Sequence, residues 1–226
     1  MKAAHIHLSS WTASFRYGGF MIGFQPTLPI PPPSTIYGLI SAAAGRVVTP
    51  YDTFIAYSFR SEGRTVDLER ILEMPLDGGG KWNVINREIL LNAELDLYVD
   101  PSLQGAFLRP HFPLLLGRSS DLATVDVVET VDLEEVSVDE VSTFGESVYT
   151  DPPRGFRLSL LYALPVYFTD TIPRRAVGTR PFTMIAERYQ GRGRGHCDPA
   201  VGLTLEVLSV ESLGLGVRHG SSGQGK

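Results

Sequence analysis

The chain has 226 residues, of which 43% are hydrophobic and 20% are charged, and its formal net charge is −5. This length is enough for one large domain or two small ones, and the composition is typical of a globular protein. No apolar run approaches the roughly 18 residues of a membrane span, residues 1–10 lack a signal-peptide pattern, and the single cysteine excludes an internal disulfide framework. The sequence therefore predicts a cytoplasmic protein with no membrane segment.

The negative charge is concentrated in one stretch. Residues 121–151 contain ten of the 25 acidic residues and no lysine or arginine. The rest of the chain then has 15 acidic residues against 20 basic ones, a net charge of +5 (20 minus 15). Most of the bases are arginines, which bind phosphate through two N–H groups and stack on nucleobases. A GC-rich genome produces the same bias, so charge alone does not identify the function.

The N-terminal region predicts a strand followed by a helix. The stretch from His5 to Trp11 is β-prone. The three prolines at residues 31–33 require extended backbone, and Ser34 is suited to cap a helix that ends near Gly45. The apolar residues of this helix recur with the i, i+3, i+4, i+7 spacing of a buried face, at Ile36, Leu39, Ile40 and Ala43.

The middle of the chain predicts antiparallel strands. A turn is expected at Glu62-Gly63, and the Gly-rich residues 75–81 form a flexible tip. The strand–helix–strand–strand order favours an α+β fold with a ferredoxin-like or RRM-like antiparallel sheet. The β-rich runs of this region are residues 53–60, 65–74, 82–91 and 94–99.

The C-terminal part is also β-rich, and the helix content is low. We expect a single domain over residues 1–213 and a disordered tail over residues 214–226. The β-rich runs here are residues 123–128, 156–163, 182–189 and 203–210.

Common catalytic and metal-binding motifs are absent from the sequence. There is no GxxxxGK[ST], HExxH, CxxC or GxSxG pattern. His5 and His7 would share a strand face as metal ligands do, but no third ligand is near in the sequence. Cys197 and His196 lie in an expected loop without rigid support, and His111 lies between prolines, where packing is its more common role. No catalytic residue, metal or cofactor is therefore predicted.

Three segments do carry residues suited to phosphate and bases. Residues 26–45 place a proline loop before a helix N-terminus, where free N–H groups and the helix dipole favour anions. Residues 82–91 combine a tryptophan with an arginine on a hairpin arm, and residues 116–120 combine a glycine that permits close backbone approach with arginine and hydroxyl groups. Each segment taken alone also has the composition of an ordinary turn without a binding function. The residues concerned are Ser34, Thr35, Trp82, Arg87, Gly117, Arg118 and Ser119.

Together these segments resemble the Cas-five family of CRISPR-associated proteins. The family's N-terminal signature, a proline-rich loop leading into a PPPSTIYGLL-type helix, is similar to residues 26–45 (PTLPIPPPSTIYGLISAAAG). Its arginine-containing strand and the strand after it are similar to residues 86–99 (NREILLNAELDLYV), and its LGRS-type segment to residues 114–125 (LLLGRSSDLATV). Order and spacing agree, and the resemblance covers roughly residues 3–128.

The resemblance implies an RRM-like domain with a β-hairpin thumb near residues 75–92. It implies a non-catalytic subunit of a type I, I-B-like, Cascade complex that binds the 5′ repeat-derived handle of the CRISPR RNA in antiviral defence. The implied partners are the CRISPR RNA, a Cas-seven backbone subunit, a Cas-eight-type large subunit and, through the complex, target DNA. The candidate RNA contacts are Arg16, Ser34, Thr35, Arg46, Trp82, Arg87, Gly117, Arg118 and Ser119, of which Arg16 and Arg46 follow only from their flanking positions.

Two other functions stay open. One branch of the family, in type I-C systems, cuts precursor CRISPR RNA without metal, using Tyr, Lys and His. Tyr37 and His111 are available here, but the only internal lysine, Lys81, lies on the Gly-rich tip, so no Lys–His pair is expected. The third interpretation is an unrelated RRM-like binding or scaffolding module.

The charged candidates also have a structural alternative. Arg87 would pair with Glu88 or Glu94, and Arg118 with Asp121, as buried ion pairs. Residues 121–151 should repel a phosphate backbone, so we expect them to lie away from RNA, facing either solvent or a basic neighbouring subunit.

Overall fold

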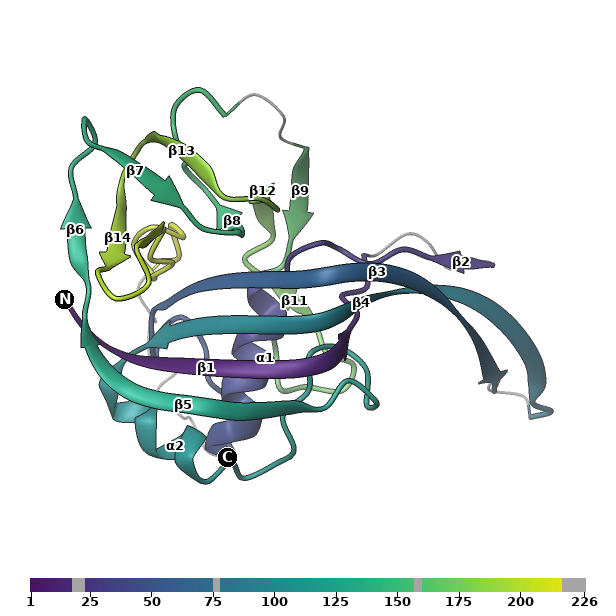
Figure 1. Cartoon of the computed structure of the whole chain (residues 1–226). Coiled ribbons are helices and arrows are strands. Elements are labelled where there is room, and N and C mark those ends of the chain that lie inside the picture. Colours follow the sequence, from purple (N-terminus) through teal and green to yellow (C-terminus); the bar gives the residue numbers. More distant parts are fainter. Residues whose placement is uncertain (18–22, 75–77, 157–159, 217–226) are drawn as a thin grey trace.

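The computed structural model describes residues 1–17, 23–74, 78–156 and 160–216 (Figure 1). Strands dominate these residues, in agreement with the predicted α+β class. The N-terminal half contains β1 (Lys2–Ala13), β2 (Phe24–Gln25), α1 (Pro33–Ala44), β3 (Ile55–Glu73), β4 (Lys81–Val99), a 3-10 turn (Pro101–Leu103), α2 (Gln104–Leu108) and β5 (Ala123–Asp132). The C-terminal half contains β6 (Glu134–Val136), β7 (Val141–Phe144), β8 (Ser147–Tyr149), β9 (Leu161–Leu164), β10 (Tyr167–Phe168), β11 (Ala176–Val177), β12 (Arg180–Ile185), β13 (Tyr189–Arg192), β14 (Gly195–Asp198) and β15 (Leu203–Leu205).

The main sheet has the ferredoxin-like strand order. Strand β4 pairs antiparallel with β3 on one side and with β1 on the other, and β1 pairs antiparallel with β5. The spatial order is therefore β3–β4–β1–β5, with α1 connecting the first two strands of the motif. This arrangement, which Figure 1 shows with α1 lying against the sheet, confirms the predicted ferredoxin-like antiparallel sheet.

Helix α1 begins one residue earlier than its predicted cap. The N-cap is Pro32, in extended conformation, and Pro33 occupies the first turn, so Ser34 lies inside the helix and makes no capping bond. Proline is well suited to this position because its φ is already helical and it has no N–H to satisfy. The helix ends at Gly45 with φ of 67°, as predicted. The four residues of the predicted buried face are all in the core, namely Ile36, Leu39, Ile40 and Ala43.

Strands β3 and β4 form one long hairpin, whose far half extends beyond the rest of the molecule (Figure 1). The predicted turn at Glu62-Gly63 is wrong, because Gly63 pairs with Leu91 within a continuous β3. The interruption lies instead on β4, where Asn92 has φ of 48° and its side chain donates to Glu62 at 2.7 Å. Of the expected thumb at residues 75–92, residues 81–92 form one arm of this hairpin and the second half of β3 is the other arm, while residues 75–77 of the expected tip lie outside the described residues.

The C-terminal half adds small sheets to the same core. Their strand orders are β8–β12–β9, β13–β7–β15–β14–β6 and β10–β11. Phe182 of β12 and Leu208 belong to the same hydrophobic cluster as Ile6 of β1 and Ile40 of α1. His196 and Cys197 lie on β14, not in the loop that the sequence indicated.

The residues at the end of the described chain are packed. Leu215, which falls in the predicted tail, contacts the core and donates a main-chain hydrogen bond of 3.0 Å to Val210. Tyr51 donates to the carbonyl of Gly216 at 2.8 Å. Residues 215 and 216 of the predicted tail therefore contact the rest of the molecule, and residues 217–226 lie outside the described residues. Within the described residues, no helix is both long and apolar enough to span a membrane.

Candidate nucleic-acid interface

Six of the nine candidate RNA contacts line one cavity of about 630 Å³. It lies where the end of β1, the N-terminus of α1, the part of the hairpin around Glu69 and Arg87, and the loop before β5 meet. Phe15, Leu28 and Leu164 supply apolar walls, and Glu69 is its only acidic wall residue among those that the structure describes. We call it the arginine cavity, and its candidate residues are Arg16, Ser34, Thr35, Arg87, Gly117 and Arg118.

Gly117 permits the close approach that the sequence predicted, but the approaching backbone belongs to this chain. Its φ is +123°, and an added Cβ would lie 2.0 Å from the carbonyl oxygen of Ser14. The amide of Ser14 donates to the carbonyl of Leu116 at 3.1 Å. Gly117 therefore holds the loop against the end of β1 and so fixes the position of Arg118.

Arg118 forms the ion pair that the structural alternative predicted. Its Nε and NH2 atoms donate to Asp121 at 3.1 and 2.9 Å, and its amide donates to the same carboxylate at 2.9 Å. Asp121 is 0% exposed and also accepts a 2.6 Å hydrogen bond from Thr12. The carboxylate raises the pKa of Arg118 above its ordinary value, so the guanidinium stays charged.

Arg87 is also paired, though not with either residue that the sequence indicated. It is 7% exposed, and its Nε donates to Glu69 at 2.5 Å. The other oxygen of Glu69 lies 3.6 Å from NH1 of Arg118, so this carboxylate bridges two arginines. Glu88 instead accepts from Arg64 and from an amide, and Glu94 pairs with Arg60.

Arg16 is the cation of the cavity without a carboxylate partner in the part of the chain that the structure describes. Its side chain is exposed, and its backbone is held by a bridge to Thr27. Ser34 and Thr35 line the cavity beside it with half-buried hydroxyl-bearing side chains. The amide of Thr35 donates to the carbonyl of Pro32 at 2.9 Å, so the helix N-terminus offers fewer N–H groups than the sequence suggested.

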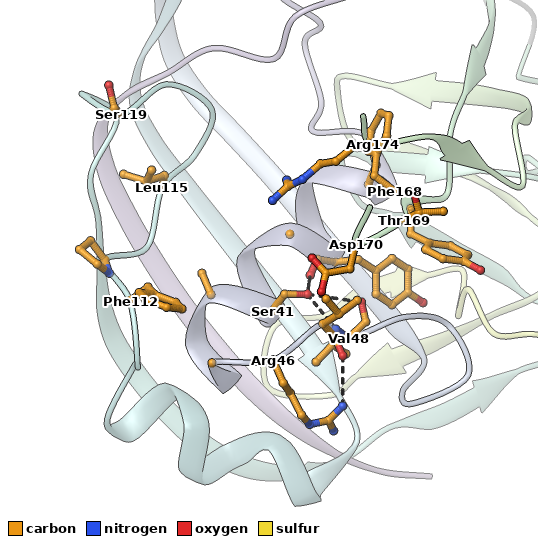
Figure 2. A pocket seen from close by; sticks show the side chains of 18 of the residues that line it. Ser41, Arg46, Val48, Phe112, Leu115, Ser119, Phe168, Thr169, Asp170 and Arg174 are labelled. Atoms are coloured by element: carbon orange, nitrogen blue, oxygen red, sulfur yellow. Dashed lines mark hydrogen bonds between the residues drawn. The ribbon is translucent and has the colours of Figure 1, made fainter. Parts of the chain in front are cut away.

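Arg46 and Ser119 line a second cavity, of about 820 Å³, along α1. Figure 2 shows Arg46 and Arg174 on either side of Ser41 in this cavity. Arg46 is exposed and pairs with Asp52 at 3.1 Å. Ser34 lines both cavities, which makes them neighbours across the first turn of α1. The structure thus separates two of the predicted contacts from the arginine cavity.

Trp82 lies on the hairpin, away from both cavities. It is 55% exposed, pairs across the hairpin with Leu72, and has the guanidinium of Arg70 stacked 4.2 Å from its ring centre. Arg87 lies five positions further along β4, about 17 Å at ~3.4 Å per residue. Trp82 is therefore a separate candidate site from the arginine cavity.

The acidic stretch is mostly exposed, with one clear exception. Asp121 lies buried against Arg118, beside the arginine cavity, and the position of the stretch relative to RNA stays a prediction. Glu146 is half-buried, contacting Ser58 and Arg188. The exposed acids are Asp126, Glu129, Asp132, Glu134, Glu135, Asp139, Glu140 and Asp151.

The remaining candidates have structural partners. His5 and His7 both bond one oxygen of Asp96, each at 2.9 Å, and the described residues contain no group of histidine, cysteine and acidic side chains that could hold a metal ion. The ring of His111 packs beneath Gly45, where an added Cβ would lie 2.6 Å from it. Tyr37 is 1% exposed and donates to the carbonyl of Thr53 at 3.2 Å.

Glu69 is the member of the arginine cavity that sequence reasoning missed. It lies 18 positions from Arg87 in sequence, and the hairpin register brings the two together by pairing Asp67 with Arg87. The diagonal neighbour two residues further along the strand is Glu69, within reach of a long side chain. The proximity of Glu69 to Arg87 could be predicted only once the register of the hairpin was known.

No family model and no curated protein matches this chain. Among solved structures, it is similar to a chain of a CRISPR RNA-guided surveillance complex, with 20% identity over 85% of this chain and 91% of that chain and a TM-score of 0.55. It is also similar to a CRISPR protein from Archaeoglobus fulgidus (10% identity, 92% and 100% covered, TM-score 0.48). A third similar chain belongs to the type III-B Cmr-beta complex bound to cognate target RNA (10% identity, 89% and 87% covered, TM-score 0.46).

Of these three similarities, the one to the chain of the surveillance complex defines the fold, because its TM-score is above 0.5. The TM-scores of the other two are below 0.5 and are too low to do so. The protein therefore has the fold of a chain found in a CRISPR RNA-guided surveillance complex. The fold that the resemblance to CRISPR-associated proteins implies is therefore confirmed.

Proposed function

We propose that this protein is a Cas-five-type subunit of a type I, I-B-like, Cascade complex, where it binds the 5′ handle of the CRISPR RNA without cutting it. The observation that carries the proposal is the arginine cavity. Three sequence segments that resemble the family, together with Arg16, come from distant positions in the chain and line one cavity. A shared fold with a chain of a surveillance complex supports the same assignment.

Within this proposal, Arg16 is the primary phosphate contact. It is exposed and has no competing carboxylate among the described residues, whereas Arg87 and Arg118 are already neutralised by Glu69 and Asp121. The paired arginines keep spare N–H groups, and their fixed positions shape the cavity floor. The hydroxyl groups of Ser34 and Thr35 add uncharged hydrogen-bond donors for phosphate or ribose oxygens.

The hairpin would take part through its exposed aromatic face. Trp82 offers a ring for base stacking, and the neighbouring Arg70 already stacks on it, leaving the guanidinium near a phosphate path. The Cas-seven backbone subunit, the Cas-eight-type large subunit and, through the complex, target DNA are the partners that this function requires. Cytoplasmic location follows from the same role.

RNA cleavage by this chain is the second candidate function, and the geometry disfavours it. The hydroxyl of Tyr37 is buried and bonded to a main-chain carbonyl, and burial raises the pKa of Tyr37 above its ordinary value. His111 is exposed and packs against Gly45 at the end of α1. The two side chains that the type I-C mechanism would use are therefore not directed at a common site.

The test is Arg16→Ala in the reconstituted complex. Handle-RNA affinity is measured by fluorescence anisotropy at several salt concentrations. Removing one phosphate contact should weaken binding by about tenfold and make the salt dependence shallower by about 0.7. The melting temperature should stay unchanged, because the side chain is exposed and has no ion-pair partner among the described residues. Arg154→Ala, which removes an exposed arginine with only a 3.9 Å contact to Asp139, is the matched control. Equal affinities for wild type and Arg16→Ala would refute the assignment of this cavity to RNA.

A further inference from the structure

Strand β5 is an edge of the main sheet, visible as its lower margin in Figure 1. Just beyond the strand, Met1 and Leu133 exchange two main-chain hydrogen bonds, of 2.6 and 2.7 Å. Hydrogen-bonded and non-hydrogen-bonded pairs alternate along an antiparallel ladder. The register with β1 therefore turns the N–H and C=O groups of Val128, Thr130 and Asp132 away from β1. Among the described residues, no other main-chain segment pairs with these three.

A groove of about 670 Å³, with both polar and apolar atoms on its surface, lies beside this edge. Its walls are α2, residues 110–114 and the first half of β5. Three of its apolar side chains face solvent: Leu108 is 64% exposed, Phe112 53% and Val127 41%. Exposed apolar side chains that line a groove next to an unpaired strand are typical of sites that receive an added strand. We call this site the edge groove.

The charges along the edge specify the occupant. Asp126 and Asp132 are exposed on β5, and Glu134 and Glu135 follow on β6. The stretch from 121 to 151 contains no basic residue. Two copies of this chain paired edge to edge would bring these carboxylates together, so a second copy is disfavoured. A strand that carries lysine or arginine would be attracted.

We propose that the edge groove binds an extended segment of another protein, which adds to β5 as a strand. Apolar side chains of the segment fill the groove, and basic side chains lie beside Asp126 on one face of the sheet and beside Asp132 on the other. The register skips Asp126 between Val125 and Val127, which marks a bulge, and before it Ala123 already donates to the carbonyl of Leu114 at 2.9 Å. The main pairing region is therefore the part of β5 after the bulge. This site is separate from the arginine cavity, and the proposal does not depend on RNA binding.

The test uses a fluorescent nine-residue peptide of alternating lysine and valine, added to the full chain. Binding is followed by anisotropy, and amide hydrogen exchange locates it. We expect the amides of Val128, Thr130 and Asp132 to gain protection. Reversing both charges in Asp126→Lys with Asp132→Lys should weaken binding about tenfold. The matched control, Asp139→Lys with Glu140→Lys, makes the same charge change at exposed positions outside β5 and should change affinity less than twofold.

Two further peptides separate strand addition from simple charge attraction. The same peptide with every backbone nitrogen methylated cannot pair with an edge, and alternating glutamate and valine reverses the charge. Both should bind at least tenfold more weakly. Binding of the methylated peptide at full strength, equal weakening by the two double variants, protection outside β5, or no binding of the lysine–valine peptide would each overturn the proposal.

Discussion

At the scale of single residues, backbone geometry and ion pairing decide what each candidate can do. Gly117 and Arg118 were singled out as residues that would meet RNA, and each first makes a contact within the chain. Gly117 lies against the carbonyl of Ser14, and Arg118 pairs with the buried Asp121. Their effect on RNA binding therefore cannot be separated from their effect on the fold without measuring both.

Gly117→Ala should strongly destabilise the protein. The added Cβ would lie 2.0 Å from a backbone oxygen at φ of +123°, so the loop has to move. We expect a loss of at least about 2–3 kcal/mol in the free energy of unfolding, measured by urea denaturation. Gly38→Ala is the control, because Gly38 lies inside α1 with no atom within 4 Å of an added Cβ. That variant should gain roughly 0.5–1 kcal/mol. A Gly117→Ala protein as stable as wild type would contradict the close approach.

Arg118→Ala should cost about 3 kcal/mol in the free energy of unfolding, because it leaves the carboxylate of Asp121 buried without its cation. The double variant with Asp121→Asn removes that charge and should recover part of the loss. Urea denaturation of the two single variants and the double variant gives the coupling energy. Additive losses would show that the pair contributes nothing to the fold. Arg118 would then be free to act on RNA alone.

At the scale of elements, local sequence patterns predicted where helices and strands occur better than they predicted whether a strand is interrupted. The spacing of apolar residues in α1 and the glycine at its end were sufficient to place the helix. Glu62-Gly63 has the composition of a turn, yet β4 pairs along the whole of β3, and those ladder bonds keep Gly63 extended. Tertiary pairing of this kind overrides local preference and is not visible in a short window.

The residues of the candidate site could be predicted from the sequence, but their arrangement could not, because it also depends on tertiary pairing. Its residues come from separate segments, and the sequence marks each segment by its own chemistry. What joins them is the register of the hairpin and the contact between the loop at Gly117 and Ser14. The sequence could not show that Arg87 would meet Glu69, or that Arg46 and Ser119 would lie in a different cavity.

The central strands predict a pH dependence of stability. His5 of β1 bonds Asp96 of β4 at 2.9 Å and Glu129 of β5 at 3.1 Å. Burial by itself would lower the pKa of His5, but the two carboxylates outweigh it and raise the pKa above 6.5. Tyr98 stacks on the ring, and His7 shares the Asp96 carboxylate.

Because the folded state holds the His5 proton more tightly than the unfolded state, this contribution is complete below pH 6.5. It is lost as the pH rises through the raised pKa. The free energy of unfolding, measured by urea denaturation, should therefore fall as the pH rises above 6.5. His5→Gln should flatten this dependence, and His111→Gln should preserve it. An unchanged pH profile in His5→Gln would exclude the contribution.

At the scale of the whole molecule, charge is segregated. The arginine cavity lies between the hairpin and the N-terminus of α1, and most of the acidic stretch lies exposed along β5 and the strands that follow. A net charge of −5 therefore coexists with a surface suited to RNA. The acidic side would keep phosphate away and remain free for protein partners.

The same arrangement predicts that the purified chain does not cut precursor CRISPR RNA. A metal-free cut needs a base and an acid on either side of one ribose. Tyr37 is bonded to the carbonyl of Thr53 inside the core, His111 packs beneath Gly45, and Lys81 begins β4 at the far end of the hairpin. Labelled repeat RNA, incubated with the chain with and without a metal chelator, should remain intact. Site-specific cleavage that survives the chelator and is lost in His111→Ala or Tyr37→Phe would replace the binding role with a catalytic one. Tyr37→Phe is the sharper of the two variants, because it keeps the buried ring and removes only the hydroxyl.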